Sequence, residues 1–128
     1  MKKNLTEEFT KESIDYLNKA DLKKRKKLGQ YFTPKYIREL LISKLPKKDN
    51  AYILDPACGS GEFLLSCEKY FNSPNLNGFE IDKNLVTIAS KLVKNSNIKN
   101  IDALNFDIKN KYDYVIGNPP YFEIKLNE

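Results

Sequence analysis

Short apolar runs alternate with amphipathic segments along most of the chain. Residues 51–55 and 76–80 are compact, largely apolar runs that each end in an acidic residue. Residues 112–116 form a similar run, which is followed by a glycine, and residues 98–101 form a weaker one. Apolar runs of this length, bounded by turn residues, predict β-strands.

Between these runs, apolar residues recur at helical spacing. The pattern predicts a helix over residues 61–70 and another that begins after Asp82, whose side chain can cap free N–H groups of the first turn. Before the first strand, Thr33 as N-cap and Pro34 as first helical residue predict a helix that ends at Pro46. The expected apolar faces of the three helices are Ile37, Leu40, Leu41 and Leu45; Phe63, Leu64 and Cys67; and Leu85, Ile88, Ala89 and Leu92.

An earlier helix is predicted near the N-terminus. It would start at Thr6 and run through a basic segment to a stop near Gly29. One face of this helix would carry Phe9, Ser13, Tyr16, Leu17 and Ala20.

Strands that alternate with amphipathic helices predict the α/β class, with a parallel sheet and helices on its faces. In open sheets of this kind, ligands bind beyond the carboxyl ends of the strands. Asp55, Glu80 and Asn118 each follow or end a predicted strand, so they would lie along one edge. A functional site is therefore expected at that edge.

Composition excludes several kinds of chemistry. The chain has 128 residues, a formal charge of +5, two cysteines and no histidine. Without histidine there is no Ser-His or Cys-His nucleophile, and two cysteines alone cannot complete a four-ligand zinc site, so no metal is expected. No apolar run approaches the roughly 18–20 residues of a membrane span, and the N-terminus lacks a secretory signal, so we expect a cytoplasmic protein without a membrane partner.

The positive charge is concentrated in the first part of the chain. Residues 1–50 carry 14 basic and 7 acidic side chains, and the densest basic segment is residues 23–27. Such a segment attracts phosphate groups of a nucleic acid. The alternative is a solvated helix end or linker, which the basic segment taken alone favours.

The segment Asp55-Pro-Ala-Cys-Gly-Ser-Gly61 joins a predicted strand to a predicted helix. Gly59 and Gly61 allow a tight turn and a close approach of the backbone to a ligand. No Lys-Ser or Lys-Thr pair follows the glycines as in a P-loop, and Asp55 and Glu62 would repel a pyrophosphate. These acids suit an ammonium or sulfonium group. A plain structural turn is the alternative.

Two further acids follow strands. Glu80 stands where nucleotide-binding α/β domains place an acid that accepts hydrogen bonds from ribose hydroxyls. Its alternative role is to cap the next helix. Asp102 follows the weak strand and could accept from the exocyclic amine of adenine, or could be a turn residue.

The segment Asn118-Pro-Pro-Tyr121 follows the last predicted strand. The side chain of Asn118 and the carbonyl of Pro119 can both act as fixed acceptors, because Pro119 and Pro120 restrict the backbone and contribute no N–H. Two acceptors match the two donors of a planar amino group. Tyr121 supplies an aromatic face on which a base can stack. The alternative is an ordinary Pro-Pro turn.

Taken together, residues 26–122 resemble the S-adenosylmethionine-dependent, adenine-specific DNA methyltransferases of bacterial restriction–modification systems. Five segments carry the resemblance in the family's order: Leu28-Gly-Gln-Tyr-Phe-Thr-Pro34, Asp55-Pro-Ala-Cys-Gly-Ser-Gly61, Gly78-Phe-Glu-Ile-Asp82, Ile101-Asp-Ala-Leu104 and Asn118-Pro-Pro-Tyr121. The resemblance implies a Rossmann-like methyltransferase fold and S-adenosylmethionine as cofactor. The implied cofactor-binding residues are Tyr31, Thr33, Asp55, Ala57, Gly59, Gly61, Glu80, Asp102, Ala103 and Asn118, and the implied catalytic residues are Asn118, Pro119, Pro120 and Tyr121.

The implied reaction is methyl transfer to the exocyclic N6 amine of adenine in DNA, with the base flipped out of the duplex. We expect a basic helical segment over residues 1–28 and a methyltransferase core over 29–128. The sheet would stop after its fourth strand, without a target-recognition domain. The expected partners are DNA and a C-terminal or specificity subunit that supplies the missing half. The alternatives are a truncated or split cofactor-binding fragment, and a methyltransferase of RNA or of protein glutamine.

Overall fold

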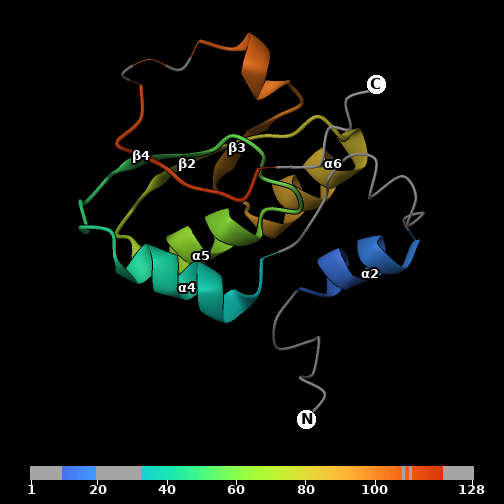
Figure 1. Cartoon of the computed structure of the whole chain (residues 1–128), viewed down its shortest axis with the longest axis horizontal. Coiled ribbons are helices and arrows are strands. Elements are labelled where there is room, and N and C mark those ends of the chain that lie inside the picture. The colour runs from blue at the N-terminus through green and yellow to red at the C-terminus, as the bar shows by residue number, and fades with distance from the viewer. Residues whose placement is uncertain (1–9, 20–32, 108, 110, 120–128) are drawn as a thin grey trace, which may run out of the picture.

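The computed structural model describes residues 10–19, 33–107, 109 and 111–119 (Figure 1). Its helices are α2 (Lys11–Lys19), α4 (Lys35–Ser43), α5 (Glu62–Tyr70) and α6 (Lys83–Leu92), with a short 3₁₀ turn, η1 (Ala103–Asn105). Its strands are β1 (Tyr52–Asp55), β2 (Asn75–Phe79), β3 (Ser96–Lys99) and β4 (Tyr114–Val115). None of the helices in these ranges is long and apolar enough to span a bilayer.

The four strands form one parallel sheet in the order β3-β2-β1-β4. This confirms the predicted α/β class and the parallel sheet. Because β1 lies between β2 and β4, the chain reverses its direction of strand addition at β1. In open α/β sheets, such a reversal leaves a crevice at the carboxyl ends of the strands, and ligands bind there.

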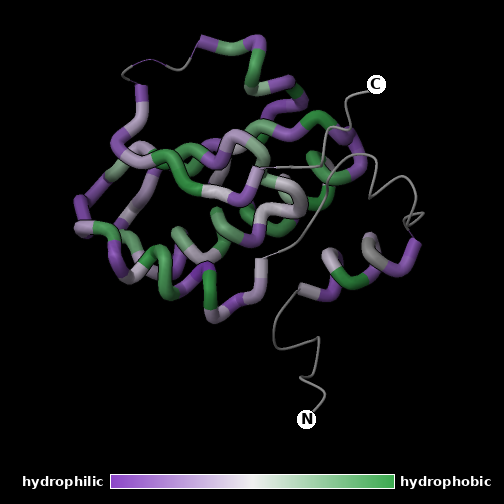
Figure 2. Tube along the Cα trace, in the orientation of Figure 1, coloured by the Kyte–Doolittle hydropathy of each residue, from purple (hydrophilic) through white to green (hydrophobic). Residues whose placement is uncertain are grey.

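The helices α4, α5 and α6 pack against one face of the sheet, and the segment that contains η1 lies over the other (Figure 1). Phe106 of that segment contacts Phe79 at the end of β2, with ring centroids 4.9 Å apart. Hydrophobic positions concentrate along the strands and at intervals along these helices, as Figure 2 shows. The buried core cluster includes Ile42, Ile53, Phe63, Leu64, Cys67, Leu76 and Ala89.

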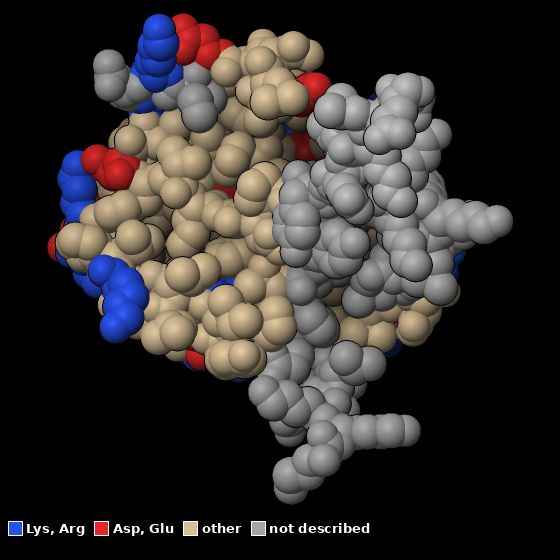
Figure 3. All heavy atoms as spheres, in the orientation of Figure 1, with Lys and Arg blue, Asp and Glu red and all other residues tan. Residues whose placement is uncertain are grey.

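The start and the buried face of α4 differ from the prediction. Pro34, not Thr33, occupies the N-cap position, no side chain caps the helix, and it ends at Ser43. Leu40 and Leu41 are 54% and 46% exposed. Figure 3 shows mostly uncharged atoms over α4, with basic side chains at the margin of that face.

The reason is a buried arginine. Arg38 and Ile42, one helical turn apart, are the buried residues of α4. The Arg38 side chain donates to the carbonyl of Thr33 (2.7 Å) and to Oγ of Ser66 (3.3 Å), and pairs with Glu62. These contacts turn the face that contains Arg38 toward α5, so Leu40 and Leu41 point outward, while Leu45 packs against the core.

The other elements lie close to their predicted positions. The Asp82 side chain accepts from the N–H of Asn84 (2.8 Å), which confirms the predicted cap of α6. β3 lies two residues earlier than the expected strand at residues 98–101. Its last residues, Ile98 and Lys99, pair with Gly78 and Phe79 of β2.

The N-terminal helix begins later than predicted. Thr10 is not helical and α2 starts at Lys11, so a continuous helix from Thr6 is not formed. Ser13 is fully buried, as expected for a residue on the inner face. Phe9, Ala20 and residues 23–27 lie outside the described residues.

β4 is anchored to β1 by contacts at its start. The Asp113 side chain accepts from the N–H of Tyr52 (2.8 Å) and from Nζ of Lys48 (2.6 Å). The hydroxyl of Tyr114 donates to the carbonyl of Pro46. At the other end, the N–H of Ile116 donates to the carbonyl of Leu54 (2.9 Å).

Candidate active site

The carboxyl ends of β1, β2 and β4 bring most of the expected site residues to one edge of the sheet. Asp55 ends β1, Glu80 follows β2, and Gly117 and Asn118 follow β4. Asp55 pairs in register with Gly78, and Leu54 with Val115, so these strand ends are level. The expected Tyr31, Pro120 and Tyr121 lie outside the described residues.

Asp55 is a buried acid in the centre of this edge. It is 1% exposed, and its Oδ1 accepts from the N–H of Ala57 (3.1 Å). Burial raises the pKa of Asp55 to about 7; the hydrogen bond from Ala57 opposes this rise, and the nearby charge of Glu80 adds to it. Asp55 therefore changes charge near neutral pH, where a cationic ligand group would favour its carboxylate form.

The loop after Asp55 requires glycine. Gly59 and Gly61 have φ values of 55° and 91°, a region that other L-residues seldom adopt. A Cβ on Gly61 would also lie only 3.2 Å from the Cβ of Ala89 in α6. The loop is joined to β2 by the N–H of Cys58, which donates to the carbonyl of Phe79 (2.9 Å). Glycine thus lets the backbone pass tightly between α6 and the strand ends.

Glu80 connects this loop to the next one. Its Oε1 accepts from the N–H of Gly59 (3.2 Å), and its Oε2 accepts from the N–H of Asp82 (2.9 Å). Burial raises the pKa of Glu80, against the lowering effect of these backbone hydrogen bonds. Each carboxylate oxygen can accept a second hydrogen bond, so the geometry is compatible with the expected ribose contact.

Asp102 and Ala103 lie at the η1 turn. The Oδ1 of Asp102 accepts from the N–H of Leu104 (3.0 Å), so this acid caps η1 as a turn residue does. Its contact with adenine remains a prediction.

Two apolar side chains at this edge were not predicted as site residues. Ile81 and Leu104 are 62% and 92% exposed. Asn100 holds the Ile81 segment in place, because its Nδ2 donates to the carbonyls of Glu80 and Ile81 (both 2.9 Å). Exposed apolar side chains beside Glu80 and Asp102 suit a planar base. For Ile81, the signal in the sequence was a large apolar residue directly after a strand-end acid; Leu104 has no such signal.

The Asn118 segment begins beside Asp55. A Cβ on Gly117 would lie 2.3 Å from Oδ1 of Asp55, so only glycine allows the two segments to approach this closely. Asn118 is partly exposed and Pro119 is exposed. The structure therefore places Gly117, directly before the Asn-Pro-Pro-Tyr segment, next to Asp55 at the start of the glycine loop.

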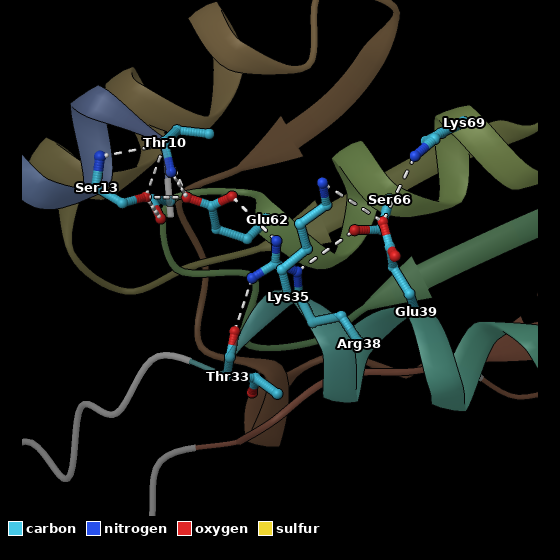
Figure 4. A network of polar contacts seen from close by, with 10 residues as sticks. Thr10, Ser13, Thr33, Lys35, Arg38, Glu39, Glu62, Ser66 and Lys69 are labelled. Carbon is cyan, nitrogen blue, oxygen red and sulfur yellow. Dashed lines mark hydrogen bonds and ion pairs between the residues drawn. The ribbon is translucent and has the colours of Figure 1, made fainter. Parts of the chain in front are cut away.

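Glu62 does not have its expected place. Instead of facing a cationic ligand, it is buried, and its Oε2 lies 3.7 Å from a guanidinium nitrogen of Arg38 (Figure 4). Among the described residues, the buried side-chain oxygens without a hydrogen-bond partner are this Oε2 and Oγ1 of Thr33. Burying a hydroxyl without a partner is costly, so Thr33 is suited to bind a polar ligand group.

These residues fit S-adenosylmethionine. An unpartnered Thr33 hydroxyl can hold the methionine end, Asp55 can balance a positive charge, and Glu80 has capacity for ribose hydroxyls. The loop between them keeps its backbone close to the site because positions 59 and 61 are glycine.

A four-stranded parallel sheet with this order and this edge is the Rossmann-like fold of S-adenosylmethionine-dependent methyltransferases. A solved structure of that class, a putative class I S-adenosylmethionine-dependent methyltransferase from Listeria monocytogenes, matches with a TM-score of 0.63 and 23% identity. The match covers 84% of this chain and 36% of that chain.

The profile of the family described as N-6 DNA Methylase matches residues 15–127. The chain therefore belongs to the N-6 DNA methylase family. It is 36% identical over 114 residues to the Type II methyltransferase M.CvrRI of Paramecium bursaria Chlorella virus XZ-6E, a match that covers 89% of this chain and 30% of that protein. It is 39% identical over 105 residues to the Type II methyltransferase M.HincII of Haemophilus influenzae, covering 82% of this chain and 19% of that protein. The chain thus spans less than a third of the length of either relative.

Proposed function

We propose that this chain acts in the transfer of a methyl group from S-adenosylmethionine to the N6 amine of adenine in DNA, in a restriction–modification system. The observation that supports the proposal is the close approach of Gly117, the residue before Asn118, to Asp55, which begins the glycine loop. A cofactor held by the loop and a base held by the Asn-Pro-Pro-Tyr segment would then be neighbours. Membership of the N-6 DNA methylase family supports the same reaction.

The bound cofactor supplies an activated methyl group on a sulfonium. Asp55 and Thr33 would hold its methionine part, with Tyr31, and the backbone of Ala57, Gly59 and Gly61 would lie against it. Glu80 would accept from the ribose hydroxyls of the cofactor, and Asp102 and Ala103 would contact the adenine of the cofactor. Ile81 and Leu104 would lie against the faces of the same adenine ring.

The substrate side of the site is formed by the segment after β4. The side-chain oxygen of Asn118 and the carbonyl of Pro119 would accept both hydrogens of the target amine and so direct the nitrogen lone pair toward the methyl carbon. Pro120 would restrict the backbone, and Tyr121 would stack on the flipped base. The protein would act by holding the target amine and the methyl group in the geometry for reaction. Such positioning alone can lower an activation barrier by roughly 7–11 kcal/mol.

The remaining function would come from parts of the enzyme outside this chain. The two relatives are much longer than the matched region, so we propose that a C-terminal region or a specificity subunit reads the DNA sequence. The basic segment at residues 23–27 would add contacts to phosphates. The proposed location is the cytoplasm, where the DNA substrate is found.

The test is incorporation of labelled methyl groups from S-adenosylmethionine, with the protein supplied alone and together with the C-terminal half of a matched relative. Duplex DNA, RNA and a glutamine-containing protein are offered as separate substrates. We expect label in adenine of DNA, and loss of that label in Asn118→Ala. Label in RNA or protein instead of DNA would identify the alternative methyltransferases. Cofactor binding without transfer to any substrate would support the cofactor-binding fragment.

A further inference from the structure

Glu62, the first residue of α5, is bound to the beginning of α2. Its Oε1 accepts from the N–H of Thr10 (3.1 Å), from Oγ1 of Thr10 (2.7 Å) and from Oγ of Ser13 (Figure 4). These donors lie 49 to 52 residues away in the sequence. One buried carboxylate therefore joins the start of the N-terminal helix to the glycine loop.

The charge of Glu62 is stabilised from three sides. The carboxylate lies at the N-terminus of α2 and in the first turn of α5, where helix dipoles favour negative charge. The guanidinium of Arg38 lies on the third side. A buried charge held by so many partners is costly to leave unpaired, so loss of the α2 contacts would disturb α5 and its preceding turn.

Ser60 gives α2 a second contact with the same loop. Its Oγ lies 2.6 Å from Oγ of Ser13, and both side chains are buried. Ser60 stands between Gly59 and Gly61. Its side chain points toward α2, so the backbone of the loop stays accessible to a ligand.

A third contact reaches the neighbouring loop. The hydroxyl of Tyr16 donates to Oδ2 of Asp82 (3.2 Å). Asp82 also donates its N–H to Glu80, the expected ribose acceptor. The helix α2 is thus attached to both loops that carry expected cofactor residues.

We propose that Glu62 is a positioning residue that couples the docking of α2 to cofactor binding. The docked α2 holds the turn from Gly59 to Gly61 in its ligand-ready conformation through Glu62 and Ser60. The proposal rests on the cofactor site proposed above. Coupling between two equilibria is reciprocal. If docked α2 raises the affinity for the cofactor by some factor, the bound cofactor must favour the docking of α2 by the same factor.

The test uses Ser13→Ala, which removes contacts to Ser60 and Glu62, and Glu62→Gln, which removes the charge. Glu39→Gln is the matched control, because Glu39 forms ion pairs with Lys35 and Lys69 at the surface of α4. Affinity for S-adenosylhomocysteine is measured by calorimetry. Amide hydrogen exchange in residues 11–19 is measured with and without saturating S-adenosylhomocysteine.

We expect Ser13→Ala and Glu62→Gln to bind S-adenosylhomocysteine about three- to tenfold more weakly, the loss typical of one or two hydrogen bonds. The ligand should slow exchange in α2 of the unmodified chain, and less so in the two variants. Glu39→Gln should match the unmodified chain in both measurements. If Glu62→Gln does not fold, Ser13→Ala decides the question.

Unchanged affinity in folded Ser13→Ala, or exchange in α2 that does not respond to the ligand, would overturn the coupling while leaving the cofactor site intact. Failure of the unmodified chain to bind S-adenosylhomocysteine would overturn the cofactor site and the coupling with it. Neither readout depends on DNA methylation, so a wrong DNA substrate would not affect this test.

Discussion

Gly117 and Asp55 approach so closely that any side chain at position 117 would collide with the carboxylate, since a Cβ there would lie 2.3 Å from Oδ1. The backbone after β4 and the acid at the end of β1 therefore fix each other's position. Gly117 directly precedes the expected catalytic segment, and Asp55 begins the expected cofactor loop. Their contact joins the two halves of the proposed site.

Replacement of Gly117 by alanine should displace either Asp55 or the backbone that leads to Asn118. Overpacking of this kind typically costs about 1–3 kcal/mol in the free energy of unfolding. Urea unfolding measures this loss. Val115→Thr is the control: the side chain lies two residues earlier and is exposed, so its change should stay within about 0.5 kcal/mol. Equal stability of Gly117→Ala and the unmodified chain would show that the contact is not tight.

Stability should fall as the pH rises from about 4 to about 7. The pKa of Asp55 is raised from 3.8 to about 7, so between these values the folded chain binds a proton that the unfolded chain has lost. The stabilisation by Asp55 is complete below the pKa that Asp55 has in the unfolded chain, and it is lost as the pH rises through the pKa of the folded chain. Between these two values the free energy of unfolding falls by about 1.4 kcal/mol per pH unit. Glu80, whose pKa is also raised, acts in the same direction.

Urea unfolding at several pH values measures this slope. Asp55→Asn should flatten it and leave the smaller contribution of Glu80. Asp49→Asn, at an exposed position, should leave the slope unchanged. A slope that survives in Asp55→Asn would assign the pH dependence to another group.

Cofactor affinity should show the opposite pH dependence. If Asp55 balances a positive charge of the cofactor, binding requires its carboxylate, which forms as the pH passes about 7. Affinity for S-adenosylmethionine should then increase from about pH 6 to about pH 8, with release of a proton on binding. Calorimetry in buffers with different ionisation enthalpies measures that proton. No proton release near neutral pH would remove Asp55 from contact with the charged group.

Glu80→Ala should weaken S-adenosylmethionine binding roughly tenfold or more, because a charge-assisted hydrogen bond to ribose is lost. It should also lower stability, since the N–H groups of Gly59 and Asp82 lose their acceptor. Glu80→Gln, which keeps an acceptor, should recover part of the stability and less of the affinity. Glu68→Ala, at an exposed position of α5, is the control. Glu80→Ala with full affinity would contradict the ribose assignment.

The order of elements and the site edge could be predicted from the sequence because they depend on local patterns. Apolar runs that end in Asp55 and Glu80 mark strand ends, and parallel strands bring their ends to one edge. Asp82 was recognisable as a cap because its acceptor function is local.

Contacts between distant segments were not predictable in this way. The spacing of leucines in α4 suggested one buried face, but Arg38 and its partner Glu62, 24 positions apart, selected another. Glu62 was expected to face a cationic ligand, but it binds Thr10 and Ser13, which are far away in the sequence. Burial of a charge depends on such partners, and hydrophobic periodicity carries no information about them.

The alignment of the last strand has a further consequence for Asn118. β4 pairs with β1 through only two residue pairs, and a slip by one residue would shift it by about 3.3 Å and turn each side chain to the opposite face. Asp113, bonded to Tyr52 and Lys48, and the hydroxyl of Tyr114 oppose such a slip from the start of the strand. The position of Asn118 in the proposed site is therefore set by side chains at the far end of β4, which lie outside that site.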